Sequence, residues 1–449
     1  MKRPLVAVLA TLLLAAGFAG QSQASGPTGD PSGWTDRQLA LRLVMAGYDM
    51  SDTDAARPWV RDGLGGVLLF GRPPGDLGQR LAGLRAEATG APLVASDEEG
   101  GQVQRLDPLL PRLPSAATLA RTRTPAQARD LAVSYGRQMR ALGVDVSLAP
   151  VADLAIPGQY IAQTKRAFSA DPSTVAAYAG AWQAGLREAG VVPVAKHWPG
   201  HGDAANTHGR AASTPVLSVL ESRDLLPFTA LLQAGVPAVM LGHLNVPGLT
   251  EPGIPATLSP QAYGYLRERA GPDRLLLTDS MSMGAITGGL GLTPAQGAVR
   301  ALRAGADMVL VDTGPGPLVE AISRALADGS YARSAAIASA RRVLAVSQPG
   351  SASPVSVAPA AASPAAPPPP SALPPPPLPV VEPPPPPPPP PAPSARRDIA
   401  PGAPPARVST QDRQSVDRQL VGLGPPQPLR LQDLCDCAPD SALPREDSR

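Results

Sequence analysis

Short aliphatic runs that return at regular intervals between residues 33 and 347 constrain the fold of this chain more than any other feature. Eight runs follow this pattern, at residues 43–47, 66–70, 93–97, 144–149, 192–196, 238–242, 275–279 and 308–311. Apolar strands that alternate with helix-forming stretches predict a parallel sheet covered by helices. Eight such strands over about 300 residues predict an α/β fold of the (β/α)8 type, a closed barrel, rather than an open sheet.

The stretches between these runs carry helix signals of their own. They are rich in Ala, Leu, Arg and Gln, and the clearest are residues 76–89, 125–142, 172–189, 220–234 and 294–304. Pro125 and Pro172 suit the first turn of a helix, where a missing N–H is harmless. Thr124 and Asp171 directly precede them and are of the types preferred as helix caps. The core must be aliphatic, because only 3% of the residues are aromatic.

The N-terminus has the pattern of a secretory signal peptide over residues 1–24. Lys2 and Arg3 precede an apolar run at 5–19, and small residues lead up to Ala24. The apolar run is short for a membrane span. We therefore expect an exported protein (periplasmic, in the cell envelope or secreted), with an uncleaved anchor as the alternative.

Proline dominates the C-terminal region. More than half of the 58 prolines follow Gly350, and residues 383–391 are all proline. Such a run predicts a polyproline II spacer, because proline has a fixed φ and no N–H. We expect a Pro-rich linker over 350–405, through which the protein associates with the cell envelope, and a disordered tail over 406–449.

The two cysteines, Cys435 and Cys437, both lie in this tail and cannot form a disulfide framework for the rest of the chain. We interpret them as a feature of the tail, with a metal-binding pair as the alternative. The formal net charge is only +2, which gives no reason to expect a nucleic-acid partner. We expect a monomeric barrel domain over residues 33–347.

Polar residues gather at the carboxyl ends of the predicted strands, the face that carries the chemistry in (β/α)8 barrels. The third to seventh strands end at or next to Asp97, Asp153, Lys196-His197, His243 and Asp279, respectively. All four histidines of the chain fall in two of the loops at this face. A random scatter of surface histidines does not produce this arrangement.

Two of these motifs suit catalysis. After the fifth strand, glycines at 200 and 202 permit close approach of the backbone to a ligand. His208 lies further along the same loop, and a histidine suits acid–base chemistry because its pKa lies near working pH. Asp279, at the end of the seventh strand, suits nucleophilic attack, with a helix N-cap as the alternative.

A third motif, at residues 97–105, combines acidic residues with two glycines. Asp97 and Arg105 can bind a sugar or pair with each other. Glu98 and Glu99 can instead bind a cation. A solvated acidic turn is the alternative, but it leaves the double glycine unexplained.

Together these motifs resemble the bacterial β-N-acetylglucosaminidases of glycoside hydrolase family 3. The matching segments follow the family's order and cover most of residues 35–345: Gly-Gly-Val-Leu-Leu-Phe at 65–70, Asp-Glu-Glu-Gly-Gly-Gln-Val-Gln-Arg at 97–105, Ala-Pro-Val-Ala-Asp at 149–153, Lys-Arg-Ala-Phe-Ser-Ala-Asp-Pro at 165–172, Lys-His-Trp-Pro-Gly-His-Gly at 196–202 and Thr-Asp-Ser-Met-Ser-Met at 278–283. The resemblance implies hydrolysis of oligosaccharides that end in β-linked N-acetylglucosamine. The predicted export suggests peptidoglycan fragments or chitin-like oligosaccharides as the source of this sugar.

The resemblance also implies roles for individual residues. It places the nucleophile at Asp279 and the acid/base at His208. It places the groups that hold the sugar at Asp97, Arg105, Arg166, Lys196 and His197. It implies a retaining mechanism through a covalent glycosyl-enzyme, with neither a metal nor an organic cofactor.

One position departs from the family. Where the family has an Asp that orients the acid/base histidine, this chain has Asn206. An amide can accept a hydrogen bond but carries no charge, so it supports the cationic imidazole less well. Asp203 is a candidate to supply the missing charge.

Two other function classes stay open. Asn206 favours a barrel that binds glycans with weakened turnover. The clustered histidines and carboxylates suggest a metal-dependent hydrolase, in which His197 and His201 would face together on a helix. Pro199, Gly200 and Gly202 argue against a helix there.

Overall fold

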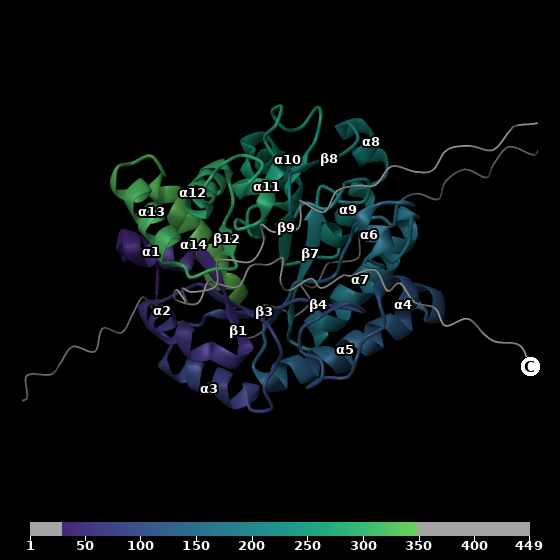
Figure 1. Ribbon diagram of the computed structural model, residues 1–449, viewed down its shortest axis with the longest axis horizontal. Helices are drawn as coiled ribbons and strands as arrows, with labels where there is room; N and C mark the ends of the chain where they lie inside the picture. The colour runs from purple at the N-terminus through teal and green to yellow at the C-terminus, as the bar shows by residue number, and fades with distance from the viewer. Residues whose placement is uncertain (1–28, 348–449) are drawn as a thin grey trace, which may run out of the picture. The chain divides into compact units, whose positions relative to one another are not determined.

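The computed structural model describes residues 29–347, so the predictions for residues 1–24, 350–405 and 406–449 lie outside the described residues. Eight parallel strands close into a barrel in the order β1-β12-β11-β9-β7-β6-β3-β2 (Figure 1). They are β1 Val44–Asp49, β2 Gly66–Phe70, β3 Leu93–Ser96, β6 Val146–Ser147, β7 Val192–Trp198, β9 Ala238–Leu241, β11 Leu275–Ser280 and β12 Met308–Val311. Each coincides with one of the eight predicted runs, and the predicted (β/α)8 barrel is confirmed.

Helices surround the barrel, and most of them connect successive strands. They are α1 Asp36–Arg42, α2 Arg57–Asp62, α3 Leu77–Glu87, α4 Ala116–Thr122, α5 Pro125–Leu142, α6 Tyr160–Gln163, α7 Pro172–Glu188, α8 Leu217–Ser222, α9 Leu225–Gln233, α10 Pro260–Ala270, α11 Gly284–Thr287, α12 Pro294–Ala304, α13 Gly316–Ala327 and α14 Arg333–Ser347. Three short 3-10 turns lie at Pro31–Gly33, Met50–Ala56 and Ala256–Leu258. None of the helices described within residues 29–347 is long and apolar enough to cross a membrane.

The predicted helix starts are confirmed by their caps. Thr124 accepts a hydrogen bond from the main-chain N–H of Gln127, and Asp171 accepts one from that of Thr174. The single helix predicted over 220–234 is wrong. The chain breaks into α8 and α9 at Arg223, whose backbone leaves the helical region (φ −141°, ψ −72°). Its side chain pairs with Asp203 of an upstream loop and with the adjacent Asp224.

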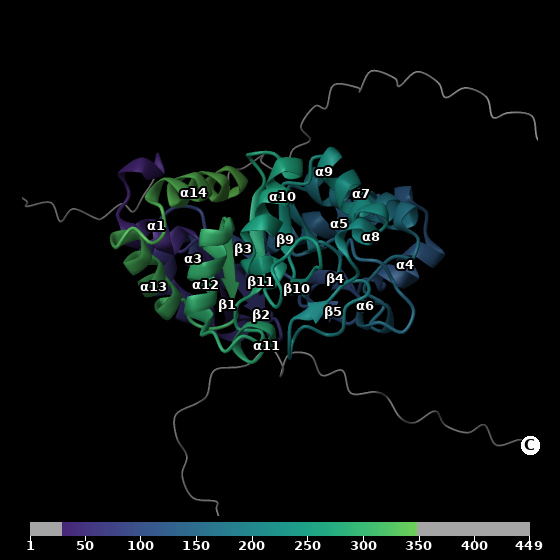
Figure 2. The same ribbon diagram turned by 90° about the horizontal axis from the view of Figure 1, so that it is seen from above.

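Two apolar layers stabilise the barrel. Outward-facing strand residues such as Val67 and Val309 pack against the helices, and inward-facing ones such as Leu68 and Leu277 fill the interior. Val343 and Val346 of α14 join the interior layer. Ser339 and Arg342 of the same helix bond the carboxylate of Asp307, which directly precedes β12. Helix α14 therefore closes the end of the barrel where the strands begin, opposite to α11 and β5 (Figure 2).

Two small sheets lie beyond the carboxyl ends of the strands. The antiparallel hairpin β4 Glu98–Gly100 and β5 Val103–Gln104 follows β3, and β8 Ala212–Ser213 pairs with β10 Leu244–Asn245. The barrel thus has one end closed by a helix and the other surrounded by loops that carry polar residues.

Candidate active site

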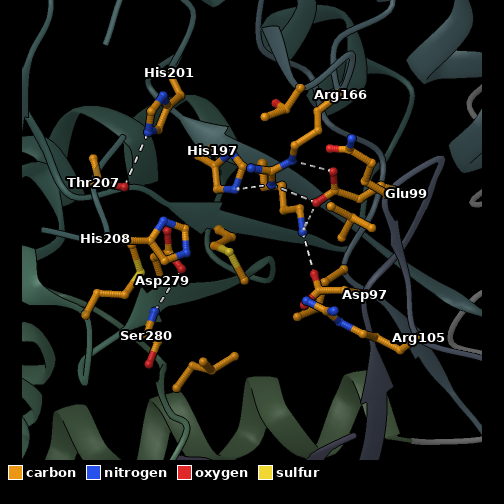
Figure 3. Close-up of a pocket in the computed structure, with 18 of the residues that line it drawn as sticks. Asp97, Glu99, Arg105, Arg166, His197, His201, Thr207, His208, Asp279 and Ser280 are labelled. Atoms are coloured by element: carbon orange, nitrogen blue, oxygen red, sulfur yellow. Dashed lines mark hydrogen bonds and ion pairs between the residues drawn. The ribbon is translucent and has the colours of Figure 1, made fainter. Parts of the chain in front are cut away.

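A cavity of about 320 Å³ opens at the carboxyl ends of the strands (Figure 3). Its walls are polar, and its floor is made by apolar side chains of the strands. The polar residues that line it include Asp97, Glu99, Arg105, Tyr160, Arg166, Lys196, His197, His201, Thr207, His208, Asp279 and Ser280. All seven residues predicted as catalytic or sugar-binding are therefore at one pocket. The eighth, Asn206, contacts the pocket through His208.

The hairpin β4–β5 places the acidic motif against the pocket, and its double glycine is required by close packing. Gly100 and Gly101 have φ values of +87° and +63°. A Cβ atom on Gly100 would lie 2.3 Å from the carbonyl oxygen of Pro114, and one on Gly101 would lie 2.7 Å from Cβ of Ser115. Only glycine fits both the backbone conformation and the space. The interpretation as a solvated acidic turn is wrong, because Glu98 and Glu99 are buried.

A chain of alternating charges runs along one wall of the pocket. The Nζ atom of Lys196 lies 2.6 Å from Asp97 and 2.7 Å from Glu99. Arg166 donates two hydrogen bonds to the same Glu99 carboxylate, at 2.7 and 2.8 Å. Burial opposes ionisation of Glu99, but Arg166 and Lys196 hold its pKa well below the usual value. From the sequence, the only role suggested for Glu99 was to bind a cation. In the structure its partners are the cationic side chains of Arg166 and Lys196.

The backbone before Arg166 adopts an unusual conformation. Lys165 has φ +57°, the only positive value outside glycine in the described part of the chain. Its carbonyl accepts a hydrogen bond from the main-chain N–H of Ala117. Non-glycine residues adopt this conformation at a cost, and such positions occur often at functional sites. The next side chain, Arg166, is the one that bonds Glu99.

Asp153 organises the loop after β7. Its buried carboxylate accepts from the main-chain N–H groups of His197 (3.1 Å) and His201 (2.8 Å) and lies 2.7 Å from Nδ1 of His197. The Nε2 atom of His197 is 3.4 Å from Nη2 of Arg166. From the sequence, Asp153 was placed at a strand end but given no role. Its place at the carboxyl end of a strand was the feature that could have predicted a role in the site.

His201 was also missed as a pocket residue. Burial lowers its pKa to about 4, so its ring is neutral at physiological pH. Its Nε2 atom lies 3.3 Å from Oγ1 of Thr207, the residue before His208. His201 therefore helps to hold the loop that carries the predicted acid/base.

Asp279 lies at the end of β11 and faces the pocket. Burial opposes its ionisation, but the neighbouring His243 and His197 and the N–H of Ser280 (2.9 Å from Oδ1) hold its pKa below the ordinary value. It is thus a carboxylate at neutral pH. The alternative interpretation as a helix N-cap is wrong, because the next helix, α11, begins at Gly284 and its N-cap is Met283.

His208 lies beside Asp279 in the pocket (Figure 3). The Oδ1 atom of Asn206 accepts from the main-chain N–H of His208 at 3.0 Å and also lies within hydrogen-bond distance of Nδ1. Because that oxygen only accepts, Nδ1 carries a proton and Nε2 is the free nitrogen of a neutral ring. Burial lowers the pKa of His208, and the charge of Asp279 partly offsets this effect. Asp203 does not supply the charge missing at Asn206, because it pairs with Arg223.

The metal-dependent alternative gains no support from the geometry. His197 lies in a strand and His201 in the following loop, so the two do not share a helix. Among residues 29–347, no group of three or more His, Cys, Asp or Glu side chains is arranged to hold a metal ion.

A (β/α)8 barrel whose pocket joins a carboxylate, an imidazole and a wall of charged donors and acceptors has the arrangement expected of a glycosidase. Residues 40–346 match the glycosyl hydrolase family 3 N-terminal domain. The chain is 40% identical over 342 residues to the beta-hexosaminidase LpqI of Mycobacterium tuberculosis, a match that covers 72% of this chain and 85% of that protein. The chain belongs to glycosyl hydrolase family 3.

Solved structures of the same family share the fold. A family 3 member from Mycobacterium smegmatis is 39% identical, with a TM-score of 0.66, and the match covers 71% of this chain and 98% of that one. A family 3 β-N-acetylglucosaminidase from Paenibacillus sp. str. FPU-7 is 29% identical, with a TM-score of 0.67 over 73% of this chain and 65% of that one. These findings confirm the predicted family and the predicted glycosidase activity.

Proposed function

We propose that the protein is an exported enzyme that removes terminal β-linked N-acetylglucosamine with retention of configuration. The observation that carries this proposal is that an ionised Asp279 and His208 line the same pocket, with Nδ1 of His208 next to Asn206. The curated relatives named beta-hexosaminidase and the Paenibacillus neighbour support the substrate class. Peptidoglycan fragments and chitin-like oligosaccharides are the glycans outside the cytoplasm that offer this terminal sugar.

The first chemical step uses both groups. An oxygen of the Asp279 carboxylate attacks the anomeric carbon while the bond to the leaving oxygen breaks. The cationic form of His208, with a proton on Nε2 as well as on Nδ1, gives the Nε2 proton to the leaving oxygen and becomes neutral. Asp97, Arg105, Arg166, Lys196 and His197 hold the hydroxyl groups of the sugar. Their binding energy favours the distorted ring of the transition state.

The second step reverses the proton movement. Neutral His208 takes a proton from water through Nε2, and the water oxygen attacks the anomeric carbon and releases Asp279. The positive charge that develops on the imidazole faces a neutral amide oxygen at Asn206, where a carboxylate would stabilise it more strongly. This favours a second candidate, a barrel that binds glycans and turns them over slowly.

The test compares hydrolysis of chromogenic β-N-acetylglucosaminide and β-glucoside, with and without exhaustive chelation. The proposal expects activity on the first substrate alone, unaffected by chelation. Asp279→Asn, which keeps the shape of the side chain, should lower turnover by roughly 10⁴-fold or more. A fluorinated slow substrate should label Asp279 covalently in the wild-type protein. Labelling of another residue refutes the assignment, and inactivity on every β-N-acetylglucosaminide favours the binding protein.

A further inference from the structure

The side chain of Glu98 points away from the pocket although both of its neighbours line it. Asp97 and Glu99 face the cavity, whereas Glu98 is only 1% exposed and contacts the interior of the protein. Alternate residues of an extended chain face opposite sides, which explains this arrangement. The proposed mechanism gives Glu98 no role, so a buried carboxylate in the middle of the sugar-binding motif requires an explanation.

Four donors surround the Glu98 carboxylate. Its Oε1 atom accepts from Oγ of Ser96 at 2.6 Å and from the main-chain N–H groups of Arg105 and Leu106, each at 3.1 Å. Its Oε2 atom accepts from the hydroxyl group of Tyr135 on α5. Burial raises the pKa of Glu98 to about 7 in spite of these bonds. The molecule thus keeps an ionisable group at a position where ionisation is costly.

These contacts connect the two ends of the hairpin. Ser96 lies at the end of β3, just before Asp97, and the N–H of Arg105 lies just after β5. The main-chain pairing itself is weak, because β4 and β5 contain three and two residues and their register shifts between Glu98 and Gly100. The direct bond between the N–H of Arg105 and the carbonyl of Asp97 is long, at 3.3 Å. The Glu98 carboxylate therefore adds a charged, buried connection between the segments that carry Asp97 and Arg105.

Tyr135 anchors this connection to the helical layer. Its hydroxyl oxygen also accepts from Nε2 of Gln104 at 3.1 Å, and Oε1 of Gln104 accepts from the N–H of Leu113 at 2.7 Å. The hairpin and the segment behind it are thus fixed to α5 through one hydroxyl group.

We propose that Glu98 is a positioning residue for substrate binding, whose buried carboxylate sets the spacing between Asp97 and Arg105 across the hairpin. The inference rests on the proposed function, because it takes Asp97 and Arg105 as groups that bind the sugar. Glu98 touches no substrate and acts through the two residues that do. Without the carboxylate the hairpin widens and the sugar binds more weakly. The positions of Asp279 and His208 stay unchanged.

The experiment measures KM and kcat separately with the chromogenic β-N-acetylglucosaminide at pH 8. Glu98→Ala should raise KM by about 10- to 100-fold and change kcat much less, because a small displacement of binding groups has effects of this size. Glu98→Gln keeps an oxygen for Ser96, Arg105 and Leu106, and its KM should stay within about 3-fold of the wild-type value. Rescue by the amide would show that position rather than charge is what the site requires.

The matched control is Asp307, a buried carboxylate with four donors at the opposite end of the barrel. Asp307→Asn should lower the melting temperature and leave KM unchanged. Asp97→Ala separates the two proposals. If Asp97→Ala raises KM and Glu98→Ala does not, the Glu98 proposal alone is overturned. If neither variant raises KM, the sugar-binding assignment fails and the Glu98 proposal fails with it.

A second variant keeps the test decisive if Glu98→Ala does not fold. Tyr135→Phe removes one donor from the carboxylate and one anchor from the hairpin without creating a cavity. It should raise KM by about 3- to 10-fold with kcat nearly unchanged. An unchanged KM in Tyr135→Phe, with the melting temperature lowered, would show that the network serves stability alone.

Discussion

The amide oxygen of Asn206 contacts two polar groups of His208: its Oδ1 atom accepts the main-chain N–H and lies within hydrogen-bond distance of ring atom Nδ1. The main-chain N–H fixes the amide orientation, since an amide nitrogen could not accept it, and Nδ1 is then the donor to the same oxygen. The imidazole is therefore oriented without being charged. A carboxylate would both orient the imidazole and stabilise its cationic form. Asn206 does only the first.

The described end of the chain gives a prediction about the tail. Val343 and Val346 of α14 fill the closed end of the barrel, whereas Pro349 lies just beyond the described residues. Truncation after Pro349 should leave the melting temperature and kinetics unchanged. Truncation after Arg341 removes both valines and should lower the free energy of unfolding by at least about 3 kcal/mol. Thermal melts of the two truncated proteins test this, and a large loss in the longer one would show that the tail packs on the barrel.

Lys165 gives a prediction about strain next to Arg166. Lys165→Gly removes the strain of the +57° φ angle but adds chain entropy to the unfolded state. Its free energy of unfolding should stay within about 1 kcal/mol of wild type, with KM unchanged. Lys165→Val places a β-branched side chain in the same conformation, and should cost more than about 1 kcal/mol and raise KM. Equal KM values for the two variants would contradict a positioning role for this turn.

The pKa of Glu98 predicts a pH-dependent difference in stability. Burial raises this pKa from its ordinary value of 4.5 to about 7, so between these values the unfolded chain ionises while the folded protein stays protonated. The wild-type protein must therefore lose stability as pH rises across this interval, and the loss is complete above pH 7. Glu98→Gln does not titrate. Its stability relative to wild type should rise by on the order of 2–3 kcal/mol between pH 4.5 and pH 8. Chemical denaturation of both proteins at the two pH values measures the change, and a constant difference would contradict the raised pKa.

Periodicity was sufficient to predict the barrel. The runs at 66–70 and 308–311 coincide with β2 and β12, and the helices predicted over 125–142 and 294–304 coincide with α5 and α12. These predictions succeed because burial on one face imposes a repeat that the local sequence displays. The break between α8 and α9 was not predictable in this way, since the apolar pattern runs through it and the Arg223–Asp203 pair joins it to another loop.

The site shows the same division between local and non-local information. Ordered motifs located Asp97, Lys196 and Asp279 because each lies at a strand end. They did not distinguish Glu98 from Glu99, adjacent residues of one type that face opposite sides of the hairpin. The buried position of Glu98 involves a hydrogen bond from Tyr135, which lies 37 positions away in the sequence. Such pairings arise from packing of the folded chain, which a single sequence does not display.

The final prediction concerns the missing charge at position 206. In the second chemical step the imidazole of His208 becomes positive as it takes a proton from water. Burial already lowers the pKa of His208, which makes this uptake less favourable. A carboxylate at position 206 would hold the same orientation through its oxygens and would stabilise the cation by its charge.

Asn206→Asp should therefore raise kcat on the order of 10-fold and move the pH optimum upward, because a neighbouring anion raises the pKa of a histidine. The gain should fall mainly on release of the glycosyl-enzyme, so any pre-steady-state burst of the wild-type protein should shrink in the variant. Full pH profiles of kcat and kcat/KM with the chromogenic β-N-acetylglucosaminide measure both effects. Asn206→Ser, which accepts a hydrogen bond without a charge, is the control and should not share the gain. A fall in kcat for Asn206→Asp, or an optimum that moves to lower pH, would show that the neutral amide is the better partner for His208 in this pocket.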